Sequence, residues 1–224
     1  MFEIPDILDV PEIYFESPEL PSFPELTLLY GLIPRGLGTG ACESLKSHVG
    51  RLADAHRVSP TTLLEEVLSK KLVAHNISWK HENTWDWNGN SHVYSSMGDM
   101  TRGLTIVLTE VTGVEGLFHC TMLSMRDILD ARGLVASESR HCPLCLQETR
   151  DTVNIYGQLI WELECVTACP VHRIQLVPSK CGVSQGRPLI LSRRKLLSGV
   201  CSTCGSIGYL CRGRTLTIAS DVEI

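Results

Sequence analysis

Two short stretches of the chain, far apart in the sequence, each carry a pair of residues that bind metals. Cys142 and Cys145 are separated by two residues, Cys169 and His172 are spaced in the same way, and 23 residues lie between the pairs. Two ligands with this spacing on a tight turn can reach one ion, and a second such turn completes a tetrahedron. Thiolates and imidazole suit zinc. We therefore expect Cys142, Cys145, Cys169 and His172 to form one closed, structural zinc site.

A second zinc site is predicted after the first one. Cys201 and Cys204 are again separated by two residues, but the upstream pair is incomplete because Ser184 stands where its second cysteine would be. Serine is a poor zinc ligand, so Cys211 is the candidate for the fourth sulfur, with Cys165 as an alternative that we rather expect in the core. The predicted second site consists of four cysteines: Cys181, Cys201, Cys204 and Cys211.

The remaining cysteines and histidines are assigned no function from the sequence. Cys42 and Cys120 stand alone and are interpreted as small buried hydrophobic residues. His141 is expected to be a neighbour of the first site and not a ligand, and His48 and His56 are expected on the surface.

Composition narrows the class of protein. Of the 224 residues, 43% are apolar and 20% are charged, which is ordinary for a soluble globular protein. Nine of the ten cysteines fall between residues 120 and 211, a clustering that indicates metal binding in a reducing compartment. No apolar run approaches the roughly 20 residues that span a bilayer, and no basic residue precedes position 31. We therefore expect a cytoplasmic protein with no membrane partner.

Charge is unevenly distributed along the chain, although the net charge is only −5. Residues 1–27 are predicted to form an acidic, proline-rich arm. The C-terminal end is basic, and this charge could contact nucleic acid or simply form a solvated face. The candidate phosphate-binding residues are Arg193, Arg194, Lys195, Arg212 and Arg214.

Between the arm and the cysteine pairs, apolar spacing predicts helices. We expect a first helix that begins near residues 39–42, a second that begins at Ser59-Pro60, a third over 99–112 and another over 125–131. The first two would form a helix-turn-helix-like unit, although most such hairpins do not bind DNA. The predicted fold is a mainly α N-terminal domain followed by small zinc-finger or zinc-ribbon modules. The predicted domains are 1–27 (arm), 28–136 (helical domain), 137–176 (first zinc finger) and 177–224 (second zinc-finger-like module and basic tail).

No catalytic site is apparent in the sequence. A Cys-x-x-Cys redox pair usually lies in a thioredoxin-like alternation of strands and helices, which is not predicted here. The glycine-rich stretch 36–40 lacks the Lys-Ser/Thr of a phosphate-binding loop, and there is no His-Glu-x-x-His sequence. We expect a protein that is not an enzyme.

The order of several short motifs resembles the TniQ/TnsD family of transposition target-selection proteins. The resemblance covers roughly residues 28–211 and includes the expected helical domain. The matching motifs are Pro34 with Glu43-Ser44 and Arg51-Leu52-Ala53, the segment 108–123, and Arg140-His141-Cys142 through Cys145 with Cys169-Pro170-Val171-His172 and Leu176.

The resemblance implies an adaptor that links a target-recognition module to an AAA+ ATPase and to the transposase complex. That module would be a DNA site or an RNA-guided CRISPR effector. The alternative is a zinc-stabilised, sequence-specific DNA-binding regulator, which needs a basic recognition helix. The expected second helix instead carries Glu65 and Glu66 beside Lys70 and Lys71. A zinc-dependent enzyme would need an open coordination position, which four protein ligands do not leave.

Overall fold

A computed structural model of the chain describes residues 26–77, 94–149, 155–179 and 215–220. This part is mainly helical and contains little strand, as the sequence predicts. The predicted acidic arm falls almost entirely outside the described residues, as does most of the predicted second zinc module. No helix in the described ranges is long and apolar enough to cross a membrane.

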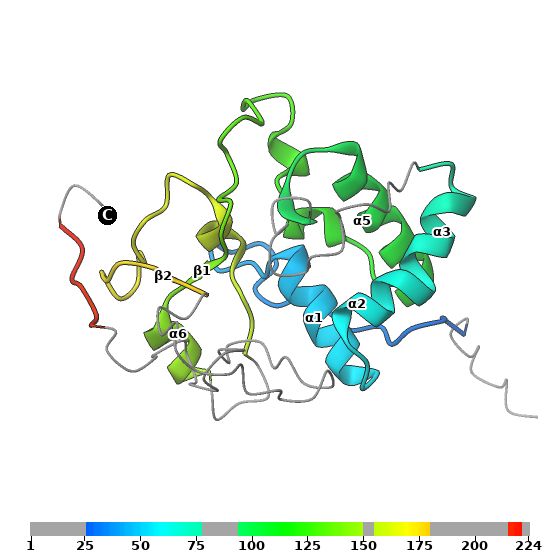
Figure 1. The fold of residues 1–224 in the computed structure, drawn as a ribbon, viewed down its shortest axis with the longest axis horizontal. Coiled ribbons are helices and arrows are strands. Elements are labelled where there is room, and N and C mark those ends of the chain that lie inside the picture. Colours follow the sequence, from blue (N-terminus) through cyan, green and yellow to red (C-terminus); the bar gives the residue numbers. More distant parts are fainter. Residues whose placement is uncertain (1–25, 78–93, 150–154, 180–214, 221–224) are drawn as a thin grey trace, which may run out of the picture.

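The described elements follow one another in a simple order (Figure 1). Helices α1, α2, α3 and α5 and two 3-10 turns come first, and a smaller C-terminal part carries β1, α6, a 3-10 turn and β2. The bounds are α1 Leu45–Ala55, α2 Pro60–Leu63, the π-helical turn η1 Leu64–Leu68, α3 Ser69–Ala74, α5 Asp99–Thr112, η2 Leu117–Cys120, η3 Leu123–Met125, β1 Arg140–His141, α6 Pro143–Glu148, η4 Leu159–Glu162 and β2 Val177–Pro178.

The helix starts are set by side chains that cap free backbone amides. Ser44 caps α1 by accepting from the Ser47 N–H at 3.2 Å, so α1 begins at Leu45 and not near residues 39–42 as expected. Ser59 accepts from the Thr62 N–H at 3.0 Å and Pro60 takes the first helical position, which confirms the predicted second start. From Pro60 the chain stays helical through α2, η1 and α3.

The helical part buries its leucines in one core. Leucines of α1, the α2–α3 stretch and α5 are fully buried, as their spacing predicts, and α5 ends where Gly113 adopts a left-handed conformation (φ 68°). Among these fully buried leucines are Leu45, Leu52, Leu64, Leu68, Leu72, Leu104 and Leu108.

The helix expected over 125–131 is wrong. The 3-10 turn η3 and a single α-type hydrogen bond, from the Leu129 N–H to the Met125 carbonyl at 2.9 Å, occupy this region. Its apolar residues, Met125, Ile128 and Leu129, are all exposed. Because so short a helix is marginal in water without packing against a core, helical spacing alone does not form it here.

A buried carboxylate organises the loop before α1. Glu43 has no exposed side-chain surface and lies 2.7 Å from both Nε and Nη2 of Arg51 in a bidentate pair. The Ser47 hydroxyl donates to the same carboxylate at 2.9 Å, and the Arg35 N–H donates at 3.1 Å. Arg51 also reaches the Ile33 carbonyl at 3.1 Å. One acidic side chain thus ties the incoming loop to the first two turns of α1.

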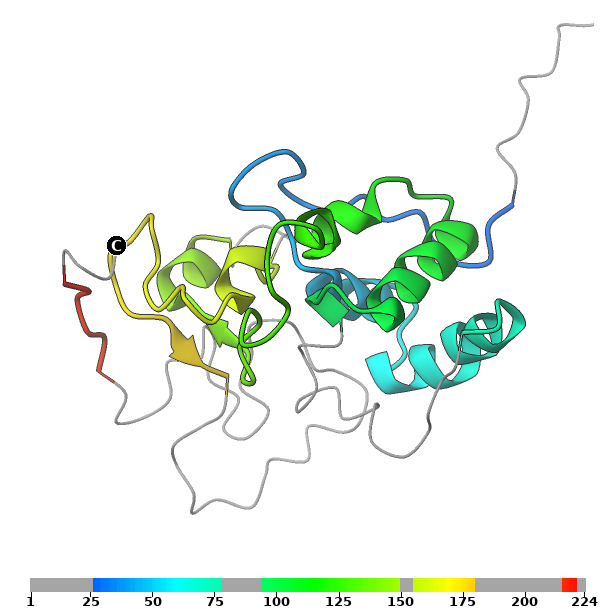
Figure 2. The ribbon, with the colours of Figure 1, turned by 90° about the horizontal axis from the view of Figure 1, so that it is seen from above.

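The helical part is joined directly to the smaller C-terminal part. The Leu159 N–H donates to the Cys42 carbonyl at 2.7 Å, and the Ser44 N–H donates to the Gly157 carbonyl at 2.9 Å. Figures 1 and 2 show the two parts side by side, with α6, β1 and β2 on one side of α1. The residues that start α1 therefore also hold the C-terminal part in place.

His48 corrects a sequence prediction, because it is fully buried and not on the surface. It follows Ser44 by one helical turn, on the inner side of α1, and neither of its ring nitrogens hydrogen bonds to a described residue. Burial lowers its pKa to about 4, although the nearby Glu43 carboxylate raises it and Arg51 lowers it further. His56 is half-buried, with its ring stacked on Tyr30 at 4.2 Å.

We expect Arg51→Met to lower the free energy of unfolding by about 3 kcal/mol, because it leaves the buried Glu43 carboxylate without its ion-pair partner. Urea denaturation measures the change. Arg102→Met, at an exposed position on α5, is the control and should change stability by less than about 0.5 kcal/mol. Equal losses in the two variants would contradict a special role for the pair.

A second prediction concerns pH. A histidine whose pKa falls from 6.5 to about 4 on folding binds fewer protons in the folded state, so its contribution to stability is lost as pH drops below 6.5. Wild type should therefore lose about 2 kcal/mol more than His48→Leu between pH 7.5 and pH 5. Denaturation of both proteins at the two pH values measures the difference, and parallel losses would contradict the prediction.

Candidate metal centre

The first cysteine pair lies at the start of α6. Cys142 immediately precedes the helix, and Pro143 takes the first helical position, where its missing N–H costs no hydrogen bond. Cys145 follows in the first turn, so the two thiols project from one side of the helix start. The sequence Cys-Pro-x-Cys thus favours a helix start that places two sulfurs on the same face.

The second pair lies on a tight reversal of the chain. Ala168 bridges Gln175, and within this hairpin the Cys169 N–H donates to the Ile174 carbonyl at 2.8 Å. Arg173 has a left-handed backbone (φ 52°), and its N–H returns to the Cys169 carbonyl at 2.9 Å. This turn places the His172 ring beside the sulfur of Cys169, the residue at which the turn begins.

A small frame holds the two turns together. Strand β1 leads into the first turn and β2 leaves the second, and the strands pair antiparallel, with Arg140 opposite Pro178 and His141 opposite Val177. The segment 215–220 then runs along the second turn, with hydrogen bonds of 2.9 Å from the Gln175 N–H to the Thr217 carbonyl and from the Ala219 N–H to the Arg173 carbonyl.

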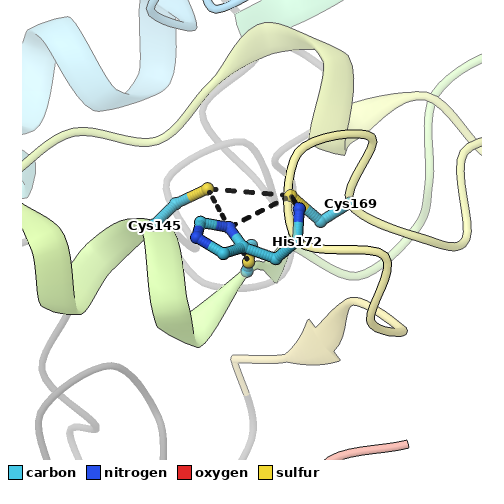
Figure 3. A group of neighbouring side chains, drawn as sticks. Cys145, Cys169 and His172 are labelled. Carbon is cyan, nitrogen blue, oxygen red and sulfur yellow. Dashed lines mark hydrogen bonds between the residues drawn. The ribbon is translucent and has the colours of Figure 1, made fainter. Parts of the chain in front are cut away.

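The frame brings the four predicted ligands to one point, although they come from turns more than twenty residues apart. Figure 3 shows three of them, Cys145, Cys169 and His172, facing one another. One ligand atom from each of Cys142, Cys145, Cys169 and His172 lies within 4.8 Å of the others. His172 Nδ1 is 3.5 Å from the sulfur of Cys142, 3.2 Å from that of Cys145 and 3.7 Å from that of Cys169. The sulfurs of Cys145 and Cys169 are 3.7 Å apart.

These spacings fit a tetrahedral metal ion. Around a zinc ion with bonds of about 2.3 Å to sulfur and about 2.0 Å to nitrogen, neighbouring ligand atoms lie about 3.5 to 3.8 Å apart. The four measured distances, from 3.2 to 3.7 Å, are close to this range. The group could therefore hold one metal ion, and its soft sulfur donors and imidazole suit zinc better than calcium or magnesium.

The pKa shifts of the cysteines are also consistent with a cation-binding site. The pKa of Cys169 is lowered, because the thiols of Cys142 and Cys145 and the N–H of His172 hydrogen bond to its thiolate. The pKa of Cys145 is raised, because its thiol hydrogen bonds to Cys142 and Cys169 and is partly buried. Without an ion, Cys142 and Cys145 thus retain their protons beside the Cys169 thiolate, and metal binding would release those protons.

His172 has a second contact, on its far nitrogen. Its Nε2 lies 2.9 Å from Oε1 of Glu148, the last residue of α6. The histidine side chain is 14% exposed and the carboxylate is 66% exposed, so this pair lies at the rim of the cluster. Burial lowers the pKa of His172, but the hydrogen bonds with Glu148 and Cys169 outweigh this effect and the pKa is raised.

Apolar packing surrounds the cluster. The indole of Trp161, contributed by η4, is almost fully buried against the two turns that carry the four predicted ligands, called the ligand turns below. His141 presents its ring edge-on to Trp161 and hydrogen bonds to Ser179 at 2.6 Å, and burial together with the Lys46 charge lowers its pKa to about 3. His141 is therefore a neutral neighbour outside the four-residue group, as its position in the sequence predicts. The buried residues of this second apolar cluster are Cys142, Leu146, Trp161, Cys169, Ile174 and Leu176.

Other predicted residues have different outcomes. Cys42 and Cys120 are buried, which confirms their interpretation as small hydrophobic residues, and burial raises the pKa of both. The expectation that Cys165 packs in the core is wrong, because its side chain is exposed while the neighbouring Val166 contacts the apolar cluster. Outside the described residues lie Cys181, Cys201, Cys204, Cys211, Arg193, Arg194, Lys195, Arg212 and Arg214.

Two features of this region were missed by sequence reasoning. The Glu43–Arg51 pair joins residues eight positions apart, and only their joint appearance in the motif hinted at a connection. The Glu148–His172 contact had a weaker signal: Glu148 follows Cys145 by three residues, which places both on one side of a helix.

Comparison with known proteins adds one finding. The family model TniQ matches residues 34–176, which is more than half of the chain. The match spans the Glu43–Arg51 pair, α5 and both ligand turns, and it ends at Leu176, directly before β2. None of the curated proteins matches the chain.

We expect Cys145→Ser to lose bound zinc and to make the C-terminal part susceptible to protease, because a structural site stores folding free energy. Metal analysis of freshly purified protein and limited proteolysis measure these changes. Cys165→Ser is the matched control, since it removes an exposed thiol outside the cluster and should keep the wild-type metal content. A Cys145→Ser protein that is folded throughout and retains its zinc would contradict the prediction.

Proposed function

Because this chain belongs to the TniQ family and is therefore associated with transposition, we propose that it is a non-catalytic adaptor in target-site selection. In this role it links a target-recognition module, either a DNA site or an RNA-guided effector, to an AAA+ ATPase that recruits the transposase. The observation that carries the proposal is the family match, which extends from residue 34 in the helical part to residue 176 after the second cysteine-histidine pair.

The four-residue cluster supports a structural role for the metal. We propose that Cys142, Cys145, Cys169 and His172 bind one zinc ion. Three sulfurs and one nitrogen already complete a tetrahedron, so no position is left for a water or a substrate. When bound, zinc would supply folding free energy to the C-terminal part and would do no chemistry.

The connection between the two parts also supports an adaptor. Backbone hydrogen bonds join residues 42–44 to 157–159, and the buried Glu43 fixes the same segment to α1. A protein that links two partners must present its two surfaces in a constant relation to each other. Here that relation is set by paired backbone and a buried ion pair, and a flexible linker would not provide it.

Charge pairing disfavours the alternative, a regulator that reads DNA through its second helix. Lys70 pairs with Glu66 at 2.8 Å, and Lys71 pairs with Glu110 of α5 at 2.6 Å. Glu65 is exposed beside them. A recognition helix needs free cations for phosphates and polar side chains for base edges, and these lysines already have acidic neighbours.

An exposed apolar segment favours a protein partner. Phe118 is 46% exposed, Met125 41%, Ile128 75% and Leu129 44%, all within one short stretch after α5. Clustered apolar residues on a surface are typical of protein contacts and contribute little to binding of a phosphate backbone.

The test is a binding experiment with the full chain and two probes. At about 0.15 M salt, immobilised protein should retain the AAA+ ATPase encoded by the same transposon. Random duplex DNA should bind only weakly, with a Kd of about 1 μM or higher. Ile128→Asp together with Leu129→Asp should reduce retention of the ATPase if the apolar segment contributes, whereas Arg102→Met is the control at an exposed position elsewhere.

Other outcomes separate the two functions. Sequence-selective duplex binding by the chain alone, with a Kd of about 10 nM or lower, would favour the DNA-binding regulator. Failure to retain the ATPase, by a protein that carries its full complement of zinc, would contradict the adaptor.

A further inference from the structure

We propose that Glu148 is an outer-sphere residue of the metal centre, which fixes the orientation and tautomer of His172 so that Nδ1 faces the ion. The proposal deepens the proposed zinc site and depends on it. The imidazole of His172 makes a contact on the side away from the sulfurs, where its Nε2 lies 2.9 Å from Oε1 of Glu148.

Only one nitrogen of an imidazole can face the three sulfurs. In His172 this nitrogen is Nδ1, at 3.2 to 3.7 Å from the sulfurs of Cys142, Cys145 and Cys169. A neutral imidazole that donates its Nδ1 lone pair to a metal carries its proton on Nε2. That N–H needs an acceptor, and the Glu148 carboxylate stands at hydrogen-bonding distance from it.

The carboxylate therefore acts on the ring in two ways. By accepting the Nε2 proton, it favours the tautomer whose Nδ1 lone pair is free for a metal, and it makes that nitrogen a stronger donor. By holding Nε2 in place, it also prevents rotation of the ring away from the sulfurs. Neither effect requires Glu148 to touch the ion, which makes it a positioning residue.

The position of Glu148 on α6 gives this contact a second consequence. Cys142 immediately precedes the helix, Cys145 lies in its first turn, and Glu148 ends it. The six-residue helix α6 and its N-cap residue thus supply two sulfurs to the cluster, and the last residue of the helix contacts the histidine of the other turn. The two ligand turns are connected on both sides of the imidazole: through the site at Nδ1 and through the carboxylate at Nε2.

If Glu148 acted only on the stability of α6, its removal would not weaken the metal site. An acidic side chain at the last residue of a helix lies near the negative end of the helix dipole, which is unfavourable. Alanine there should leave the helix unchanged or slightly stabilised. Faster loss of metal from an alanine variant would therefore report the contact with His172 and not a weakened α6.

The experiment measures the rate at which full-length, zinc-loaded protein transfers its metal to an excess of a chromophoric chelator. Glu148→Ala should release zinc about 10-fold faster than wild type, at the lower end of effects of outer-sphere carboxylates because this carboxylate is largely exposed. Glu148→Gln should fall between the two, since an amide oxygen still accepts the Nε2 proton. Gln147→Ala, at the exposed neighbouring position on α6, should release zinc at the wild-type rate.

A second readout is independent of release. Nitrogen-15 NMR of zinc-loaded wild type should show His172 with its proton on Nε2, and Glu148→Ala should shift the Nε2 signal more than Gln147→Ala does. If Glu148→Ala does not fold, Glu148→Gln decides the proposal by the same two measurements.

The outcomes distinguish this proposal from the zinc site itself. Wild type that holds zinc, with equal release rates in all variants, would overturn the role of Glu148 and leave the metal site standing. Zinc bound to Nε2 of His172 in place of Nδ1 would likewise overturn the role of Glu148 alone. Wild type that binds no zinc would overturn both.

Discussion

The convergence of two distant turns on one point is the constraint on which the C-terminal part depends. Three sulfurs and an imidazole nitrogen lie within 4.8 Å of one another, a spacing that is unfavourable for thiolates unless a cation lies between them. The β1–β2 pair and the apolar cluster around Trp161 complete the unit, and six residues of that cluster are buried in the part of the chain that the structure describes. A metal ion held at this point would add to the free energy of folding of the unit.

Glu43 connects the helical part to this unit, because its backbone and its side chain contact different residues. Its backbone pairs with Gln158 in an antiparallel bridge, while its buried carboxylate is held by Arg51. A buried ion pair adds little to stability compared with apolar packing, but it strongly disfavours arrangements that leave either charge alone. We infer that the pair fixes the segment through which the helical part contacts the smaller C-terminal part.

Local signals were predictable from the sequence, and long-range ones were not. The spacing of the ligand pairs predicts that three sulfurs and a nitrogen can meet. The Ser59-Pro60 and Gly113 signals place a helix start and a helix end correctly, because each depends on nearby backbone alone. The Ser44 cap that starts α1 is itself held by a hydrogen bond from the Ser44 N–H to the Gly157 carbonyl, a contact across the fold, and the burial of His48 depends on how α1 packs against the core. The helix expected over 125–131 does not form, because the apolar side chains of that segment stay exposed among the described residues and do not pack against the core.

The return of residues 215–220 to the second ligand turn ties both ends of the intervening stretch to one small unit. On one side β2 is anchored to β1, and on the other side Ala219 bonds to Arg173 beside the histidine ligand. The free energy of closing a chain between two fixed points grows only with the logarithm of its length, by about 0.6 kcal/mol per doubling. Insertions or exchanges of sequence between these anchors would therefore be inexpensive. Such changes would leave the scaffold formed by the two turns and the β1–β2 pair in place.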